Sequence, residues 1–134
     1  MLKDIELLND AKVGIAIVKE LNDALEEVWN VYVMNFNSKA IQNVLVTCKG
    51  YGQIDDEPRE TTVMRYFLGD VPENSFAKVE PINPGLFVLN NEYFVTFYEE
   101  GNILDKKLTF LSNTIFDDVL TEIALIKKHG VLLT

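Results

Sequence analysis

Two neighbouring runs of strand-favouring residues constrain the fold more than any other part of the chain. Residues 28–36 are rich in Val, Tyr, Trp and Phe, and residues 44–47 in Val, Leu and Thr, the types preferred in β-strands. Asn37 and Ser38 between them are typical of a turn. Side chains alternate between the two faces of a strand, and the first run is apolar on both faces. We therefore expect it at the centre of a sheet, covered on both sides.

The rest of the chain repeats this pattern of short strands between turns. Further strands are expected at residues 12–20, 61–68, 76–82, 92–98 and 103–111. This spacing predicts an all-β fold, an immunoglobulin-like or fibronectin-like β-sandwich of seven to nine strands with at most short helical turns. The 134 residues contain no linker or repeat, so we expect a single domain spanning residues 1–134. The expected core comprises Trp29, Val31, Val33, Val46, Phe67, Val95, Phe97 and Phe110.

The C-terminal segment 114–128 has two interpretations. Its apolar residues match helical spacing, with Asn113 or Thr114 as the cap and Gly130 as the end, and periodicity alone slightly favours this helix. The alternative is a helical turn at residues 115–118, a strand at 120–126, a turn at 127–130 and a last strand at 131–134.

The net charge of −9, from 12 basic and 21 acidic residues, bears on possible partners. A negative surface repels nucleic-acid phosphates and anionic lipids, so neither nucleic acid nor a membrane is an expected partner. No apolar run approaches the ~18 residues of a membrane span, and the N-terminus lacks the apolar core of a signal peptide. We expect a cytoplasmic protein.

The residue types that carry most metal and catalytic chemistry are scarce. Cys48 and His129 are the only cysteine and histidine, so one chain cannot form an internal disulfide or a typical zinc site. Cys48 is in phase with Val44 and Val46, which predicts a buried thiol. The acidic run at residues 55–57 lacks the alternating pattern of a calcium loop.

No catalytic motif is recognisable either. Ser38, Ser75 and Ser112 lie outside any Gly-x-Ser-x-Gly sequence, and the glycines at Gly50 and Gly52 lack phosphate-loop spacing. Adjacent carboxylates on a strand point to opposite faces and make poor acid–base pairs. We therefore expect no catalytic residue, no metal and no cofactor, and a protein that is not an enzyme.

Amphipathic side chains on the predicted strands suggest binding instead. Tyrosine and arginine are common anchors of protein interfaces. The candidate interaction surface comprises Tyr51, Arg65, Tyr66, Lys78 and Tyr98, with Tyr93 nearby. We expect a non-enzymatic, cytosolic interaction module with a protein partner. The alternative is a small-molecule-binding protein with a pocket between the sheets or near Lys49 to Gly52.

Open sandwiches also have edge strands that can pair with another chain. Residues 76–82 carry Lys78, Glu80 and Pro81, which suit an edge that discourages pairing. Residues 12–20 are more apolar, and we expect this strand to join two copies in a weak homodimer. Because salt screens the negative charge, the dimer would tighten as ionic strength rises.

Seven segments carry a resemblance to a known family: VGIAIVKE, WNVYVMNF, VLVTCKGYG, RYFLGDVPENSFAKVEPI, LNNEYFVTFY, LDKKLTFL and KKHGVLL. Together they resemble a family of small uncharacterised Bacteroidetes proteins, some of them labelled phenylalanyl-tRNA synthetase alpha subunit. An ATP site and a basic surface for tRNA, which that label implies, are missing from this chain. Relatives have a proline at the position of Ala124, so the resemblance implies the strand interpretation for residues 120–126. It transfers no catalytic residue.

Overall fold

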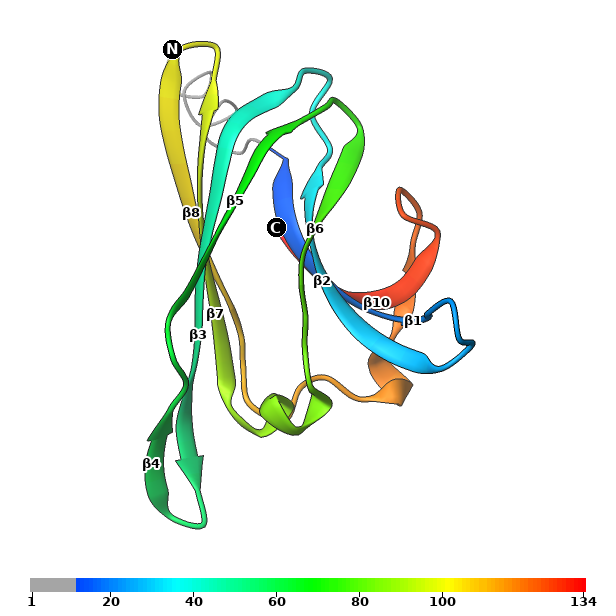
Figure 1. Cartoon of the computed structure of the whole chain (residues 1–134), viewed down its shortest axis with the longest axis vertical. Helices are drawn as coiled ribbons and strands as arrows, with labels where there is room; N and C mark the ends of the chain where they lie inside the picture. Colours follow the sequence, from blue (N-terminus) through cyan, green and yellow to red (C-terminus); the bar gives the residue numbers. More distant parts are fainter. Residues whose placement is uncertain (1–11) are drawn as a thin grey trace.

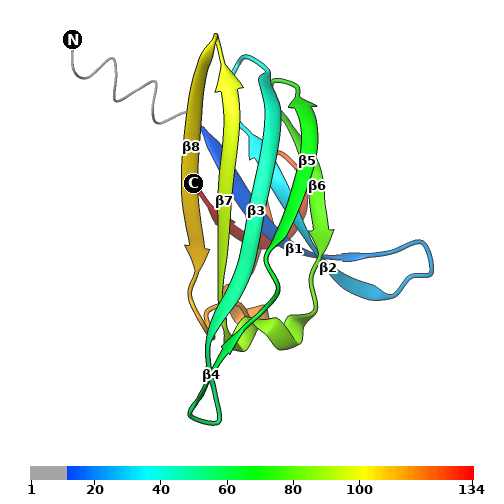
Figure 2. The ribbon, with the colours of Figure 1, turned by 60° about the vertical axis from the view of Figure 1, so that its left-hand side comes forward.

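The computed structural model describes residues 12–134, which form two antiparallel β-sheets packed face to face (Figures 1 and 2). Sheet A has the strand order β6-β2-β1-β10-β9, with β1 (Val13–Leu21), β2 (Glu27–Asn35), β6 (Ser75–Pro81), β9 (Thr121–Ile123) and β10 (Lys128–Leu133). Sheet B has β8 (Asn102–Phe110), β7 (Asn90–Glu99) and β3 (Ile41–Ile54) in that order, and the other side of β3 pairs with β5 (Met64–Val71) and β4 (Glu57–Glu60).

The predicted all-β sandwich is confirmed. The described residues contain ten strands where seven to nine were predicted, and their only helical elements are two short 3-10 helices, η1 (Pro84–Val88) and η2 (Asp117–Val119). No helix among residues 12–134 is long and apolar enough to span a membrane.

One additional strand, β4, lies between the strands expected at residues 44–47 and 61–68. The chain reverses direction there at Asp55 and Asp56, whose φ angles are 53° and 65°. A two-residue hairpin turn needs such positive φ values, and aspartate tolerates them better than most residues. This β3–β4 hairpin projects beyond the end of the sandwich (Figure 2).

The prediction that residues 12–20 form a pairing edge is wrong. Strand β1 lies between β2 and β10, and Ile15 is paired with Val33 on one side and with Leu133 on the other. Because the backbone groups of β1 are hydrogen-bonded to strands on both sides, β1 cannot pair with a strand of a second copy. The homodimer predicted through this strand is therefore excluded. The edge position of residues 76–82 is confirmed, because β6 ends sheet A.

Two glycines allow β1 and β10 to approach closely. A Cβ atom on Gly130 would lie 2.3 Å from the carbonyl oxygen of Ile17, and one on Gly14 would lie 2.4 Å from the carbonyl oxygen of Leu133. Neither distance is sterically possible, so any larger residue would separate the strands. Gly130, predicted to end a helix or to lie in a turn, is thus a required part of the β1–β10 pair.

The C-terminal segment follows the strand interpretation, and the long helix is wrong. The strand β9 is only three residues long, and the turn lies at residues 124–127 rather than 127–130. Ile123 and Ile126 are buried against Ala16, Val18 and Met34 on the outer face of sheet A. This second apolar cluster explains why β1 is apolar on both faces.

The main core fills the space between the sheets. Val31, Val33, Val46, Val95, Phe97 and Phe110 are buried there as predicted. Trp29 is half-buried at the margin, where its ring meets Phe87 edge to face at 5.0 Å. The prediction for Phe67 is wrong, because its side chain is 68% exposed. On β5 the side chains of Tyr66 and Leu68 face the core, so Phe67 points to solvent.

A half-buried carboxylate also stabilises the outer face of sheet A. Glu20 accepts hydrogen bonds from Tyr32 (2.6 Å) and Asn30 (2.7 Å), and it pairs with Lys128 at 3.2 Å. Burial alone would raise the pKa of Glu20. The hydrogen bonds from Tyr32 and Asn30 and the contact with Lys128 outweigh burial, so the pKa lies below its ordinary value of 4.5.

This lowered pKa predicts how stability depends on acid. Ionised Glu20 contributes stability that is complete above pH 4.5 and is lost as the pH falls through the lowered pKa. Glu20→Gln should therefore flatten the acid limb of a plot of unfolding free energy against pH. Asp118→Asn, which removes an exposed carboxylate, is the matched control and should leave that limb unchanged. An acid limb of wild-type steepness in Glu20→Gln would contradict this account.

Candidate functional site

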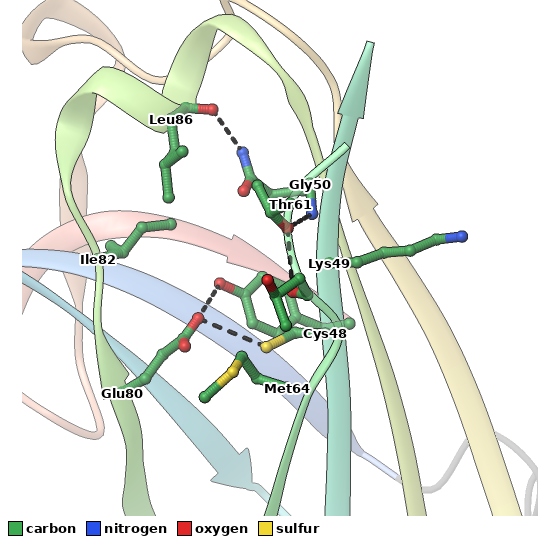
Figure 3. Close-up of a pocket in the computed structure, with 11 residues that line it drawn as sticks. Cys48, Lys49, Gly50, Thr61, Met64, Glu80, Ile82 and Leu86 are labelled. Carbon is green, nitrogen blue, oxygen red and sulfur yellow. Dashed lines mark hydrogen bonds between the residues drawn. The ribbon is translucent and has the colours of Figure 1, made fainter. Parts of the chain in front are cut away.

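A cavity of about 230 Å³ opens at one margin of the sandwich, between β3 of sheet B and the end of β6 in sheet A (Figure 3). It is lined by Cys48, Lys49, Gly50, Thr61, Thr62, Met64, Glu80, Ile82, Leu86, Asn91 and Tyr93. We call this cavity the Glu80 pocket. It lies beside Lys49 and Gly50, where the alternative function predicted from the sequence placed a small-molecule site. The Lys49 side chain points away from the cavity (Figure 3), and its ammonium group lies 5.8 Å from the ring centroid of Tyr51.

A β-bulge turns Glu80 towards this cavity. Along β6, Ala77 pairs with Val33 and faces the core, whereas Lys78 pairs with Tyr32 on the outer face. Strict alternation would place Glu80 beside Lys78, on the outside. The register shifts opposite the step from Val31 to Tyr32, and Glu80 consequently faces inward.

Three side chains donate hydrogen bonds to the Glu80 carboxylate. The hydroxyl of Tyr66 lies 2.7 Å from Oε1, and the hydroxyl of Tyr93 lies 3.0 Å from Oε2. The Cys48 thiol is 3.6 Å from Oε2. No lysine or arginine among residues 12–134 forms an ion pair with Glu80. The pocket therefore holds a carboxylate that is hydrogen-bonded by neutral donors.

Burial keeps these donors protonated. Desolvation, followed by the negative charge of Glu80, raises the pKa of Cys48 to about 12. Desolvation and the hydrogen bond to Glu80 raise the pKa of Tyr66 to about 12, and desolvation raises that of Tyr93 further still. A reactive cysteine requires the thiolate. At neutral pH the Cys48 thiol is instead a buried hydrogen-bond donor.

Asn91 and Thr61, two further polar residues of the pocket, also donate their side-chain hydrogens to protein acceptors. Both amide hydrogens of Asn91 go to the carbonyl oxygens of Leu86 and Leu89, at 3.0 and 3.1 Å. The Thr61 hydroxyl donates to the carbonyl of Thr62 at 3.2 Å and accepts from the Gly50 amide at 2.7 Å. Apart from the exposed Thr62 hydroxyl and the Lys49 ammonium group, which is directed away from the cavity, the side-chain hydrogen-bonding capacity that is left in the pocket is acceptor capacity.

The donor set does not suit a metal ion. Residues 12–134 contain no group of three or more His, Cys, Asp or Glu side chains that could hold one. A lone carboxylate with neutral oxygen neighbours provides too few charged ligands for a tetrahedral zinc site or a calcium cage.

A second candidate site is the solvent-facing side of sheet B. Five large side chains on this face are exposed, and we call them the outer patch: Leu45, Phe67, Phe94, Tyr98 and Ile103. They come from all four long strands of the sheet, β5, β3, β7 and β8.

The strand registers bring the members of the outer patch together. Leu45 pairs directly with Phe67 on β5 and with Thr96 on β7. Phe94 and Tyr98 flank Thr96 on the same face, within reach of a diagonal cross-strand contact. Ile103 of β8 pairs with Tyr98 of β7 and extends the patch to the sheet edge. The registers therefore gather the five side chains on one face around Leu45 and Thr96, and Asp105 lies opposite Thr96 on β8.

Basic residues border one end of this surface. Arg65 pairs with Thr47 on β3, and Lys107 pairs with Phe94 on β7. Lys49 follows on the same face of β3. Lys107 lies 4.0 Å from Glu92, whereas no ion pair joins Arg65 or Lys49 to an acidic residue of the described chain. This border is locally positive on a chain whose net charge is −9.

The five residues predicted as an interaction surface are not all neighbours. Tyr51, Arg65 and Tyr98 share the outer face of sheet B. Tyr66 instead points inward to Glu80, and Lys78 lies on sheet A. Sequence reasoning missed most of the outer patch because β5 and β7 carry aromatic residues on both faces. From sequence alone, the exposed aromatic residues cannot be distinguished from those in the core.

Comparison of the chain with protein-family models found no match, and searches of the curated proteins and of the solved structures found none either. The resemblance to small Bacteroidetes proteins stays a prediction.

Proposed function

We propose that the protein is a non-enzymatic interaction module that binds a protein partner through the outer patch. The observation that carries this proposal is the exposure of five adjoining apolar side chains, with Phe67 68% and Ile103 60% exposed. Isolated apolar residues are common on protein surfaces, but a contiguous patch of aromatic and aliphatic side chains marks an interaction site.

The composition and rigidity of the surface support the same conclusion. Phenylalanine, tyrosine and arginine are enriched in interfaces, and Phe67, Phe94, Tyr98 and Arg65 supply all three types. The residues that alternate with them on β7, Tyr93, Val95 and Phe97, are anchored in the core. A surface held rigid in this way loses little conformational entropy on binding.

The charge pattern specifies the chemistry of the partner. Arg65, Lys49 and Lys107 border the patch, so the complementary surface combines apolar side chains with neighbouring carboxylates. The acidic surface outside the outer patch would repel a partner that carries carboxylates, and this repulsion favours binding at the outer patch. A second copy of the chain is a poor occupant, because two chains of charge −9 repel each other.

Two finer assignments belong to this proposal. We assign the sandwich to the immunoglobulin-like or fibronectin-like class, because β1, β2 and β6 share one sheet while β3, β7 and β8 share the other, as strands A, B, E and C, F, G do in that class. In this scheme the β9–β10 hairpin extends the first sheet beyond β1. We place the protein in the cytoplasm, as its sequence suggests.

Quantitative co-purification from the native cell tests the proposal with matched variants. Phe67→Ala removes the most exposed ring of the patch, while Phe116→Ala removes a ring that is 49% exposed beside η2. An aromatic anchor of an interface contributes about 2 kcal/mol or more, which corresponds to an affinity loss of about thirtyfold. We expect one protein to be recovered with wild type and Phe116→Ala and to be lost with Phe67→Ala. Arg65→Glu should weaken the same complex.

Two results would contradict the proposal. One is recovery of the same proteins with Phe67→Ala and Phe116→Ala. The other is a partner that binds Arg65→Glu more tightly than wild type, since it would show that the bound surface is basic rather than acidic.

A further inference from the structure

We propose that the Glu80 pocket binds a small organic cation, a primary ammonium group on a short apolar body. This site is separate from the outer patch. Glu80 faces the space between the sheets, whereas the outer patch faces solvent on the far side of sheet B.

The polar groups of the pocket define the charged end of the ligand. Glu80 accepts three hydrogen bonds, and a carboxylate has about four acceptor positions. Three donors that line the pocket are committed: the hydroxyl of Tyr93 and the thiol of Cys48 to Glu80, and the amide of Asn91 to backbone carbonyls. The exposed Thr62 hydroxyl is the exception. A ligand that binds the Glu80 carboxylate must bring its own donors. An ammonium group has three donors and no acceptor.

The charge of the pocket points in the same direction. Glu80 has no lysine or arginine ion-pair partner among residues 12–134, and the Lys49 side chain is directed away from the cavity (Figure 3). A cationic ligand would supply the missing countercharge, whereas a carboxylate or phosphate ligand would be repelled by the Glu80 carboxylate.

The remaining walls define the body of the ligand. Met64, Ile82 and Leu86 present apolar side chains around the cavity, opposite and above Glu80 (Figure 3). A volume of about 230 Å³ corresponds to the space of roughly seven or eight water molecules, at ~30 Å³ each. A chain of four or five carbons with a terminal ammonium group fits these dimensions, while a nucleotide does not.

Nuclear magnetic resonance titration with n-butylammonium tests the assignment. We expect the backbone amide signals of Gly50, Thr61 and Met64 to shift in a saturable manner. n-Butanol and butyrate have a similar apolar body with a neutral or negative end, and we expect neither to reproduce the shifts.

Two variants separate binding from folding. Glu80→Gln keeps an acceptor but removes the charge, and it should weaken n-butylammonium at least about tenfold. Its matched control is Glu92→Gln, which makes the same change on the outer face of sheet B and should bind like wild type. Met64→Trp keeps Glu80 and fills the cavity from a position that is 44% exposed, so it should abolish the shifts even if Glu80→Gln does not fold.

The proposal is overturned if n-butylammonium leaves the pocket amides unshifted. It is also overturned if n-butanol or butyrate shifts them equally, or if folded Met64→Trp binds as wild type does. Loss of this site would leave the proposed protein interface untouched, since the two experiments report on opposite faces of sheet B.

Discussion

Phe97→Ala is expected to lower the free energy of unfolding by about 3–5 kcal/mol, the cost of removing a large buried aromatic ring. The side chain of Phe97 is 1% exposed and lies in the core between the two sheets. Its strand, β7, is flanked by β3 and β8, so the surrounding backbone has little freedom to collapse into the space left behind. Equilibrium denaturation by urea measures this loss.

Phe94→Ala provides the control on the same strand. Phe94 faces solvent and is 38% exposed, so its removal should cost about 1 kcal/mol or less. The comparison tests which face of β7 lies in the core, because the two rings are chemically identical and point to opposite faces of the sheet. Equal losses for both variants, or a larger loss for Phe94→Ala, would contradict the assignment of the two faces.

Gly130→Ala is expected to destabilise the protein by about 3 kcal/mol, at the upper end of the usual cost of overpacking. The added Cβ atom would lie 2.3 Å from the carbonyl oxygen of Ile17 and 2.9 Å from the Cα atom of Val18. Both atoms belong to the backbone of β1, so they cannot turn aside as a flexible side chain would. The strands must separate, which weakens the pairing of β10 and the docking of the β9–β10 hairpin.

The neighbouring residue His129 supplies the comparison. His129→Ala alters an exposed side chain on the same strand and should change the unfolding free energy by less than about 0.5 kcal/mol. Thermal denaturation of both variants distinguishes the two effects. A Gly130→Ala protein as stable as wild type would show that β1 and β10 do not approach as closely as the structure indicates.

Local pattern was sufficient for the fold class but not for the position of every strand. The alternation of Val31 and Val33 with Tyr32 and Met34 predicted a strand covered on both faces, and β2 has that environment. The same reasoning applies to β1, yet its neighbour β10 comes from the other end of the chain. A contact over such a sequence separation leaves no local signal.

The sequence predicted which face of a strand a side chain lies on only where apolar and polar residues alternate without interruption. On β5, Phe67 and Tyr66 are equally plausible core residues, and packing against the second sheet decides that Tyr66 points inward. On β6, a bulge reverses the alternation before Glu80, so a charge predicted to protect an edge becomes the centre of a cavity. Neither the inward direction of Tyr66 nor the bulge before Glu80 can be read from the pattern of apolar residues along a single strand.

Site-specific photo-crosslinking in the native cell tests the proposed interface most directly. A photoreactive phenylalanine analogue would replace Phe67 or Phe94 within the outer patch, and Phe116 as an equally aromatic, exposed site outside it. We predict that one partner protein is captured at positions 67 and 94 and is not captured at position 116. Capture at position 116 alone, capture only of a second copy of this chain, or no adduct at either patch position would contradict the proposed function.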